Sequence, residues 1–279
     1  MKSIFKRTFQ LVFLCLSFSC FLISAQINQT KKKGDYLKEK QIVFKDGEWL
    51  EFRIHYGFFN ASYVTLSLEK EKFNEYDVFH SKGYGKTTGL LRFFFKVEDI
   101  YESYFDINKT LPLRFIRKID EGGFTKNTII DFDLVNQKAY VNDIKNGENS
   151  NHKIEKNTQD LISTFYYLRN YFSLDKIKIN ESFRVNIFFD KENYDFNIKF
   201  LGIEVLDTKF GQIECLKFIP IVQKGRVFNE EESITLWVSN DLNKVPIRIQ
   251  ADIAVGSIKC DLENFKNLKY PFKIKINPK

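Results

Sequence analysis

The stretch "DINKTLPLRF" occupies residues 106–115, and nearly the same stretch, "DLNKVPIRI", occupies residues 241–249. The Asp and Pro residues of the two copies lie 135 and 134 positions apart. In each copy Asp and Asn can satisfy local backbone donors, as in a turn, and Pro can open the next strand, where its missing N–H costs little. We therefore predict two related β-halves, 48–143 and 181–264, that each use this hairpin connector once. The alternative is that a common hairpin sequence recurs by chance.

Alternation of apolar and polar residues dominates the rest of the chain. In "YDFNIKFLGI" (194–203), "IRIQADIAV" (247–255) and "NTIIDFDL" (127–134), every second residue is apolar. Such strands have one buried and one wet face, which is typical of antiparallel sheets. The pattern predicts an all-β fold, built either as one curved sheet or half-barrel or as two packed sheets. Further strands are expected at 48–56, 61–69, 76–84, 97–105, 111–120, 137–143, 182–190, 212–222 and 232–239, and a turn at 142–151.

One segment has a helical period instead. In "TQDLISTFYYLRNYF", Leu161, Phe165, Leu168 and Phe172 recur at steps of four, three and four residues, which predicts an amphipathic helix over 158–172. This helix would join the two halves. The segment "GLLRFFFKV", at positions 89–97, is too continuously apolar to be assigned by its period.

The N-terminus has the features of a secretory signal peptide. The basic start "MKSIFKR" is followed by the apolar run "LVFLCLSFSCFLISA", which ends in small residues. We predict residues 1–25 to be a Sec signal peptide that is cleaved after Ala25. A retained membrane anchor and a lipoprotein modified at Cys20 are the alternatives. The mature chain would have no transmembrane span and would lie in the periplasm or at the periphery of the outer membrane.

Much of the excess of basic over acidic residues lies near the two ends of the chain. The 43 basic and 36 acidic residues give a net charge of +7, and removal of the signal peptide leaves 40 basic residues and a net charge of +4. We expect a flexible segment at 26–43, a single β-rich domain at 44–270 and a basic tail at 271–279. Nucleic-acid binding would need a basic face interleaved with aromatic residues, so it is not expected.

Two cysteines remain in the mature chain. Cys215 and Cys260 could form one disulfide in an oxidising compartment, or they could be buried thiols on separate strands. Neither a CxxC motif nor a Cys/His cluster is present, so the sequence predicts no metal site and no cofactor.

No catalytic constellation is evident. The chain has three histidines, lacks a G-x-S-x-G elbow and lacks a glycine-rich phosphate loop. An enzyme would require scattered groups such as His55, Glu51 and Asp190 to meet in one pocket. We therefore predict a protein that is not an enzyme.

A ligand cleft beside the helix is one interpretation of the aromatic residues. Tyr166, Tyr167 and Arg169 lie partly off the apolar stripe of the predicted helix, and Trp49 and Trp237 lie in predicted strands. These side chains could line a cleft between helix and sheet. The alternative is plain packing of the helix on the sheet, with Arg169 paired to an acid.

Several stretches together resemble the domain of unknown function 3108, a family of exported proteins of Gram-negative bacteria. They are "EWLEFRIHYGFFNASYVTL", "KVEDIYESYFDINKTLPLRFIRKIDEGG", "QDLISTFYYLR", "GQIECLKFIPIVQKGRVF" and "LWVSNDLNKVPIRIQADIAVGSIKCDL". Ser62 departs from the glycine that is usual there. The resemblance implies a β-rich envelope protein without established activity, so no catalytic residues carry over. Its layout is similar to that of the periplasmic lipoprotein carriers, whose half-barrel holds a helix and an acyl chain.

These observations predict a non-enzymatic protein of the periplasm or cell envelope that binds an apolar or amphipathic, lipid-like ligand, or a partner, between sheet and helix. The alternative is a structural or assembly factor of the envelope, with a fully packed core, that meets a protein partner through sheet edges or polar faces. A continuous cleft would favour the first function and a filled interior would favour the second.

Overall fold

The computed structural model describes residues 42–171, 177–221, 234–253 and 255–274. The predicted signal peptide lies outside the described residues, as do most of the N-terminal segment and the end of the tail. These residues form fourteen strands and two helices. The elements are β1 (Glu48–Tyr56), β2 (Phe59–Phe73), β3 (Tyr76–Thr87), α2 (Gly89–Phe94), β4 (Glu98–Asp106), β5 (Pro112–Glu121), β6 (Phe124–Asp133), β7 (Lys138–Asp143), β8 (Glu148–Lys153), α3 (Leu161–Tyr171), β9 (Ser182–Phe189), β10 (Glu192–Thr208), β11 (Gly211–Pro220), β12 (Ile234–Ser239), β13 (Pro246–Asp252) and β14 (Ser257–Lys266).

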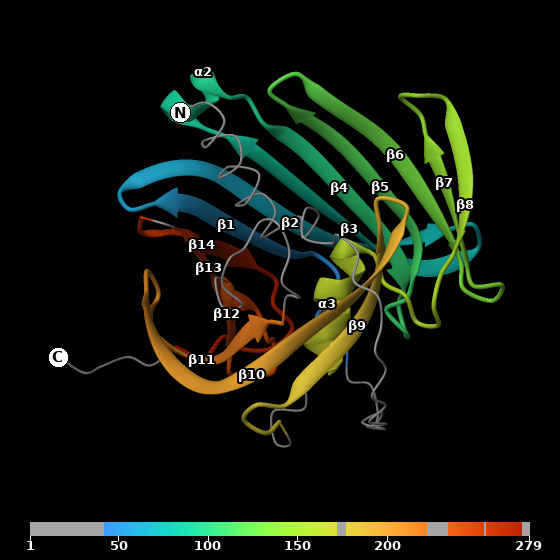
Figure 1. The fold of residues 1–279 in the computed structure, drawn as a ribbon. Coiled ribbons are helices and arrows are strands. Elements are labelled where there is room, and N and C mark those ends of the chain that lie inside the picture. The colour runs from blue at the N-terminus through green and yellow to red at the C-terminus, as the bar shows by residue number, and fades with distance from the viewer. Residues whose placement is uncertain (1–41, 172–176, 222–233, 254, 275–279) are drawn as a thin grey trace.

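All fourteen strands belong to one antiparallel sheet, in the order β8-β7-β6-β5-β4-β3-β2-β1-β14-β13-β12-β11-β10-β9. Strands β1–β8 form one meander and β9–β14 form a second, and pairing of β1 with β14 joins the two. The sheet curls strongly but does not close, because β8 and β9 remain its edges (Figure 1). Of the two arrangements that the sequence allowed, the protein has the single curved sheet.

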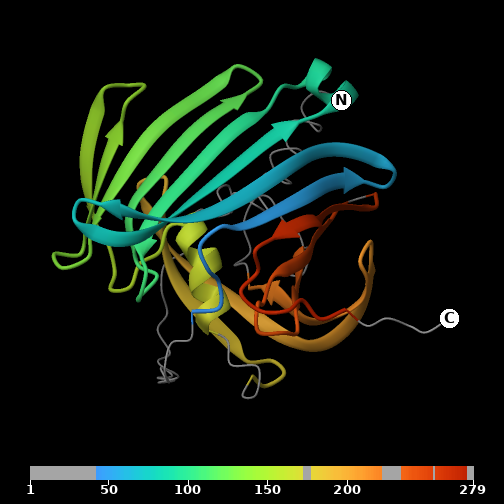
Figure 2. The same cartoon turned by 180° about the vertical axis from the view of Figure 1, so that it is seen from behind.

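Helix α3 lies inside the curve of this sheet, between β4 and β9 (Figures 1 and 2). We call the face of the sheet that contacts α3 the inner face. On β1 the inner face carries Leu50, Phe52 and Ile54, which are all buried. The alternate residues Arg53 and His55 point to the other face. The two-residue period of a strand therefore builds the core, as the alternation predicted.

The start of α3 is determined by two local contacts. Asp160 Oδ1 accepts the Ser163 N–H at 2.7 Å, and Ser163 Oγ accepts the Asp160 N–H at 2.8 Å. These reciprocal bonds satisfy donors that the first helical turn leaves open. The preceding Gln159 pairs in parallel with the edge strand β9, opposite Ile187. The helix therefore begins at Leu161, three residues later than predicted.

The two repeated connectors adopt the same kind of turn. In each, the Asp Oδ1 accepts the backbone N–H two residues on, at 2.8 Å for Asp106 and 2.9 Å for Asp241. The residue two positions before the Pro is left-handed in both, with φ of 57° at Thr110 and 50° at Lys244. The Pro residues then open β5 and β13, where a missing N–H is tolerated.

The C-terminal turn of α3 binds both connectors and the start of the sheet. Arg169 forms two hydrogen bonds with the carboxylate of Glu48, from Nη1 at 2.5 Å and from Nη2 at 2.9 Å, and its Nε donates to the Asn243 carbonyl at 3.0 Å. The adjacent Asn170 donates to Thr110 Oγ1 and accepts the Val43 N–H, both at 3.0 Å. The Arg169 and Glu48 side chains are only 3% and 0% exposed.

Some elements differ from the sequence-based expectations. Strand β8 begins inside the turn that the sequence predicts at 142–151, because "ENSNHK" lacks the alternating apolar residues that indicate a strand. Strand β14 was not predicted as a separate strand, and α2 occupies the segment that could not be assigned.

The predicted domain ends also take part in the fold. Val43 is buried, and the Tyr270 and Lys273 N–H groups donate to Asn243 and Asp241 of the second connector, at 2.9 and 3.3 Å. The described ends of the predicted flexible segment and basic tail therefore pack against the domain.

Arg169→Met should lower the free energy of unfolding by about 3–5 kcal/mol, because it leaves the Glu48 carboxylate buried without its partner. Urea denaturation followed by circular dichroism measures the change. Arg184→Gln is the matched control, since Arg184 pairs with Asp195 while 56% exposed, and should change stability by less than about 1 kcal/mol. Equal effects of the two substitutions would contradict a central role for the buried pair.

Candidate functional site

The inner face changes character along the strands. On β4, Ser103 and Phe105 lie under α3, where Ser103 Oγ donates to Asp160 at 2.6 Å and the Phe105 ring lies 5.2 Å from that of Tyr166. Toward the other end of the same strand, the inner face carries Asp99 and Tyr101. One end of the curved sheet is thus filled by the helix and the other carries polar groups.

Four neighbouring strands contribute one polar residue each to a row across this end. Tyr101 of β4 pairs with Arg117 of β5, Arg117 with Thr128 of β6, and Thr128 with Asp143 of β7. Paired residues in an antiparallel sheet point to the same face, so the four side chains lie side by side. All four are at most 9% exposed.

A pocket forms where this row meets the β9–β10 hairpin. It is lined by Phe115, Arg117, Lys126, Thr128, Ile130, Val141, Asp143, Phe189, Asp190 and Lys191, and we call it the Arg117 pocket. Counted out to its open mouth it measures about 320 Å³, but it encloses only about 20 Å³ of free space, enough for one or two water molecules. One wall is apolar and the other is charged.

The hairpin turn closes the pocket with a carboxylate. Asp190 Oδ1 accepts a hydrogen bond from Arg117 Nη1 at 2.7 Å and another from Lys126 Nζ. Asp190 and Lys191 are the two turn residues, and both are left-handed, with φ of 47° and 69°. Such a turn prefers Asn-Gly, so Asp-Lys holds this conformation under strain.

The Arg117 and Tyr101 side chains interact with each other, as do those of Asp99 and Glu121, but four buried polar atoms around Arg117 make no hydrogen bond of good geometry with another described residue. They are Asp99 Oδ2, Tyr101 OH, Arg117 Nε and Thr128 Oγ1. A buried polar atom without a partner costs about 1–3 kcal/mol, so native proteins rarely gather several in one place. Their clustering indicates that this end of the inner face is built to receive a polar group.

The buried groups around Arg117 differ in their charge at neutral pH. Burial, and then the nearby Glu121 carboxylate, raise the pKa of Asp99 to about 8, so that this carboxyl is largely protonated. Burial raises the pKa of Tyr101 to about 12. Burial alone would lower the pKa of Arg117, but Tyr101 and Asp190 outweigh it and the net shift is upward. Arg117 therefore stays charged, with neutral Asp99 and Tyr101 on one side and the Asp190 and Asp143 carboxylates on the other.

The helix residues predicted to line a cleft lie in a filled interface instead. Tyr166 is fully buried, 4.8 Å from the Phe44 ring, and its OH accepts a hydrogen bond from Ser81 Oγ at 3.3 Å. Tyr167 stacks on Tyr171 at 5.6 Å. Arg169 is paired to an acid, Glu48, as in the alternative that the sequence left open.

The two tryptophans do not join them. Trp237 Nε1 donates to Glu204 at 3.1 Å, and Trp237 is in register with Arg248, which shares the outer face of the sheet with Asp261 and Arg53. Trp49 follows the inward Glu48, so it also points away from the helix, with Lys266 Nζ 5.0 Å from its ring. The five predicted residues therefore do not form one site.

The cysteines are two buried thiols and do not form a disulfide with each other. Cys215 lies on β11 and Cys260 on β14, with β12 and β13 between them in the sheet. Strands lie about 4.8 Å apart, so the two residues exceed the reach of about 7 Å between Cα atoms that a disulfide requires. Burial raises the pKa of Cys215 to about 12, which makes its thiol inert.

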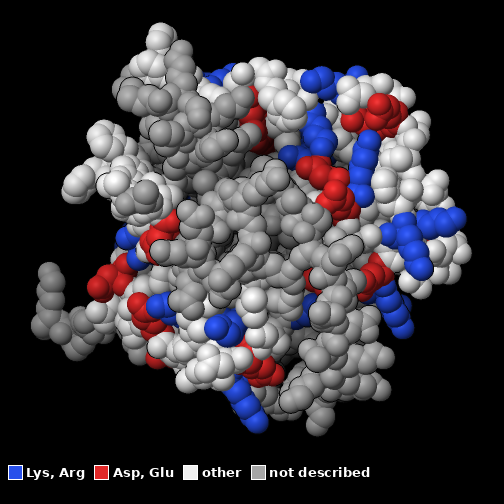
Figure 3. Space-filling view, in the orientation of Figure 1, with Lys and Arg blue, Asp and Glu red and all other residues white. Residues whose placement is uncertain are grey.

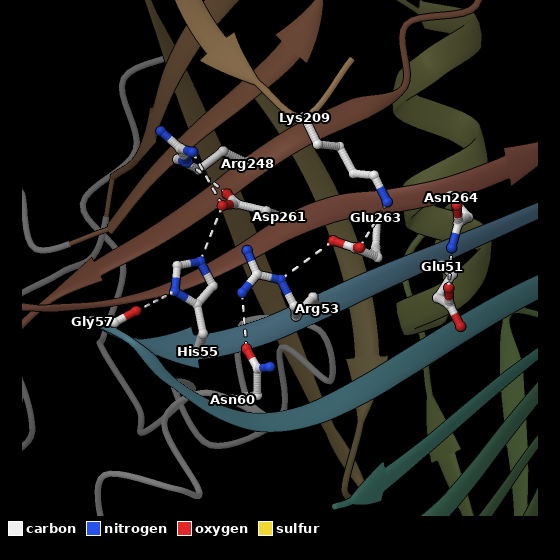
Figure 4. A network of polar contacts seen from close by, with 10 residues as sticks. All are labelled: Glu51, Arg53, His55, Gly57, Asn60, Lys209, Arg248, Asp261, Glu263 and Asn264. Atoms are coloured by element: carbon white, nitrogen blue, oxygen red, sulfur yellow. Dashed lines mark hydrogen bonds and ion pairs between the residues drawn. The ribbon is translucent and has the colours of Figure 1, made fainter. Parts of the chain in front are cut away.

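A second polar cluster lies on the opposite face of β1, β13 and β14 (Figure 4). His55 Nε2 lies 3.0 Å from Asp261, and Arg248 Nε donates to the same carboxylate at 2.6 Å. Burial would raise the pKa of Asp261, but hydrogen bonds from His55 and Arg248 lower it to about 2.

The groups of this second cluster form hydrogen bonds and ion pairs with one another and with the nearby backbone. The other ring nitrogen of His55 lies 3.0 Å from the Gly57 carbonyl. His55 and Glu51 lie on this face, whereas Asp190 lies in the Arg117 pocket, so the three groups that an enzyme would have needed do not meet.

Other classes of site find no support in the described residues. They contain no group of three or more metal-ligating side chains, and no helix that is long and apolar enough to cross a membrane. The charged side chains visible in Figure 3 are of both signs and lie intermixed.

Comparisons with known proteins identify relatives of unknown function. A family model described as "Protein of unknown function (DUF3108)" matches residues 51–263. A crystal structure of a beta-barrel-like protein of domain of unknown function DUF1849 from Brucella abortus has a TM-score of 0.52 and 7% identity, covering 81% of this chain and 100% of that one. A DUF1089 family protein from Pseudomonas aeruginosa has a TM-score of 0.27 and 7% identity, covering 79% and 95%. The comparison with curated proteins found no match.

The raised pKa of Asp99 leads us to expect a specific pH dependence of the free energy of unfolding. The folded pKa is raised, so the folded state holds a proton that the unfolded state releases between about pH 4 and 8, and stability falls as the pH rises through this range. Asp99→Asn should remove this loss, so that the variant gains several kcal/mol on the wild type between pH 5 and pH 8.5. Urea midpoints at the two pH values measure it. Asp77→Asn, an exposed change on β3, controls for loss of one carboxylate, and parallel curves for wild type and Asp99→Asn would contradict the assignment.

Proposed function

The chain belongs to the DUF3108 family of proteins of unknown function, and we propose that it is a non-enzymatic cell-envelope protein that binds a small anionic amphiphile in the Arg117 pocket. The proposal refines the ligand-binding function predicted from the sequence. It moves the site from the filled interface of α3 to the opposite end of the inner face.

The observation that carries this proposal is the unsatisfied hydrogen-bonding capacity around Arg117. The guanidinium is buried and charged, and apart from its interaction with Tyr101 its Nε makes no hydrogen bond of good geometry with a described residue. Arginine can bind a carboxylate or phosphate with two parallel hydrogen bonds. Here Asp190 accepts one hydrogen bond, from Nη1 of Arg117. Nε belongs to the Nε/Nη2 edge of the guanidinium, so an anionic group that bound this edge would reach the Nε that Asp190, on Nη1, does not.

The opposite wall supports an apolar body on the same ligand. Phe115, Ile130, Val141 and Phe189 line the pocket beside the charged groups, and the Arg117 guanidinium lies 4.5 Å over the Phe189 ring. A mixed pocket of this kind fits a molecule with an acidic end and a short apolar segment.

The enclosed space is too small for such a ligand while Asp190 is in place. Binding therefore requires the turn of the β9–β10 hairpin to move, with the ligand's anion replacing the Asp190 carboxylate on Arg117 and Lys126. The strained turn favours this exchange, because leaving the left-handed conformation relieves strain at Asp190 and Lys191. The Asp190 carboxylate in this turn thus competes with the ligand for Arg117 and Lys126.

The envelope location rests on the N-terminal sequence. The basic start and apolar run of residues 1–25 support export by the Sec route to the periplasm or the outer-membrane periphery. An apolar-ligand carrier is useful in that aqueous compartment, since amphiphiles cross it poorly on their own.

The rival function, a structural or assembly factor, is favoured by the filled interface between α3 and the sheet. Its contact surface would be the free edge of β8, which is a polar strand and therefore suited to a reversible partner rather than to aggregation. Native mass spectrometry of protein purified from the envelope separates the two functions, because the rival expects a bound protein and no small molecule.

Dodecanoate should bind the purified protein, and Arg117→Gln should weaken that binding about 10- to 100-fold, because a charge-assisted hydrogen bond contributes about 1.5–3 kcal/mol. Asp190→Asn should strengthen binding, because it removes the carboxylate that competes for Arg117. Isothermal titration calorimetry measures both changes.

Arg114→Gln is the matched control, since Arg114 is on the same strand but binds Asp131 on the opposite face. Dodecanol, which has the same chain without the anion, should bind much more weakly than dodecanoate. Binding that is equal in wild type and Arg117→Gln, or equal for both amphiphiles, would contradict the proposed site.

Export predicts a mature chain that begins at Gln26. N-terminal sequencing of protein recovered from a periplasmic or membrane fraction checks this, and intact chain recovered from the cytoplasm would argue against an envelope role.

A further inference from the structure

One end of the sheet carries exposed aromatic side chains that the fold does not require. Phe58 is 103% exposed, Phe59 78%, Phe93 86% and Phe94 73%. Val255, at 75%, lies among the same set of connections. Turns are normally built from small polar residues, so two consecutive phenylalanines at the tip of one hairpin and two more on an exposed helix call for another explanation.

These residues come from three connections that lie next to one another. Phe58 is in the β1–β2 turn and Phe59 begins β2, Phe93 and Phe94 are in α2 between β3 and β4, and Val255 is in the β13–β14 turn. The strands involved are consecutive in the sheet, from β4 to β13, so the connections meet at one end, on the upper left of Figure 1.

Two hydrogen bonds link these connections. Tyr56 OH donates to the Val255 carbonyl at 2.9 Å, which ties the β1–β2 turn to the β13–β14 turn. The Thr88 N–H donates to the Ala61 carbonyl at 3.2 Å, which ties the start of α2 to β2. We call Tyr56, Phe58, Phe59, Phe93, Phe94 and Val255 the aromatic rim.

The opposite end of the strands has no comparable group among the described residues. There, the exposed apolar residues come from separate connections: Tyr76 at the β2–β3 hairpin (62%), Val135 between β6 and β7 (90%), Ile179 before β9 (67%) and Leu242 between β12 and β13 (45%). Single exposed apolar residues of this kind are normal on protein surfaces, whereas a contiguous group marks an interaction site. This difference indicates that the protein has an interaction surface at one end of its strands.

The charge next to the rim indicates which surface it meets. The β3–β4 connection carries Arg92 and Lys96, with Lys86 at the end of β3, and the acids beside them are Glu98 of β4 and Asp120 of β5, which pairs with Lys96 at 2.7 Å while 39% exposed. The ion pairs of Arg92 and Lys96 with Glu98 are well exposed, so they are weak and can be exchanged for other anions. Aromatic side chains beside basic ones match the two layers of a bilayer surface, where acyl chains lie just beneath phosphates.

We propose that the aromatic rim docks this protein on a lipid bilayer, with the phenylalanine rings in the interfacial layer and the basic residues of the β3–β4 connection at the phosphates. The mouth of the Arg117 pocket opens at the same end of the strands, beside the β9–β10 turn. Docking would therefore present the pocket to the membrane. The docking itself does not depend on what the pocket binds.

Co-sedimentation with vesicles of phosphatidylethanolamine and phosphatidylglycerol tests the proposal. Wild-type protein should partition onto the vesicles, and Phe58→Ser combined with Phe93→Ser should reduce the partition coefficient about a hundredfold, at about tenfold for each ring. Added salt should weaken the binding of wild type, since the phosphate contacts are screened.

Tyr76→Ser combined with Val135→Ser is the matched control, because it removes two exposed apolar side chains from the opposite end. Arg117→Gln should still bind vesicles, so that failure of the pocket and failure of docking can be told apart. Wild type that stays in solution with these vesicles, or rim variants that bind as wild type does, would overturn the proposal. A dimer that the rim variants dissociate would also overturn it, by assigning the rim to a second copy of the chain.

Discussion

The buried ion pair between Arg169 and Glu48 is the contact on which the arrangement of this fold depends. It joins the last turn of α3 to the first residue of β1, the strand through which the two meanders meet. The same arginine binds the Asn243 carbonyl, and the next residue, Asn170, binds Thr110. One helical turn thus holds both repeated connectors, and moving the helix away would leave the Glu48 carboxylate buried without its partner, which is costly.

This arrangement makes the two ends of the curved sheet unlike. At the end held by α3, aromatic rings and the buried pair fill the space inside the curve. At the other end the inner face is left to Asp99, Tyr101, Arg117 and Thr128, and only the turn of the β9–β10 hairpin reaches across it. A rigid end and an end closed by a strained turn are the combination expected of a scaffold that positions a binding site.

The strands and their inward residues could be predicted because alternation is a local property of the chain. Where it was weak, prediction failed: β8 is polar on both faces, and its place in the sheet comes from pairing with β7. The pocket does have a signal in the sequence. In "FIRKI", Arg117 occupies an inward position between Phe115 and Ile119, where a charge is costly unless it has a partner or a purpose.

The sequence by itself determined the all-β character, the single internal helix and the paired connectors, because each depends on residues close together in the chain. Only the tertiary structure decided that α3 fills its interface, that Arg169 meets Glu48, and that Arg117 faces Asp190 from a hairpin 73 residues away. Which inward charges meet depends on how far the sheet curls and which strands become its edges. No local pattern encodes these, since they follow from the sum of strand twist and of packing around the helix.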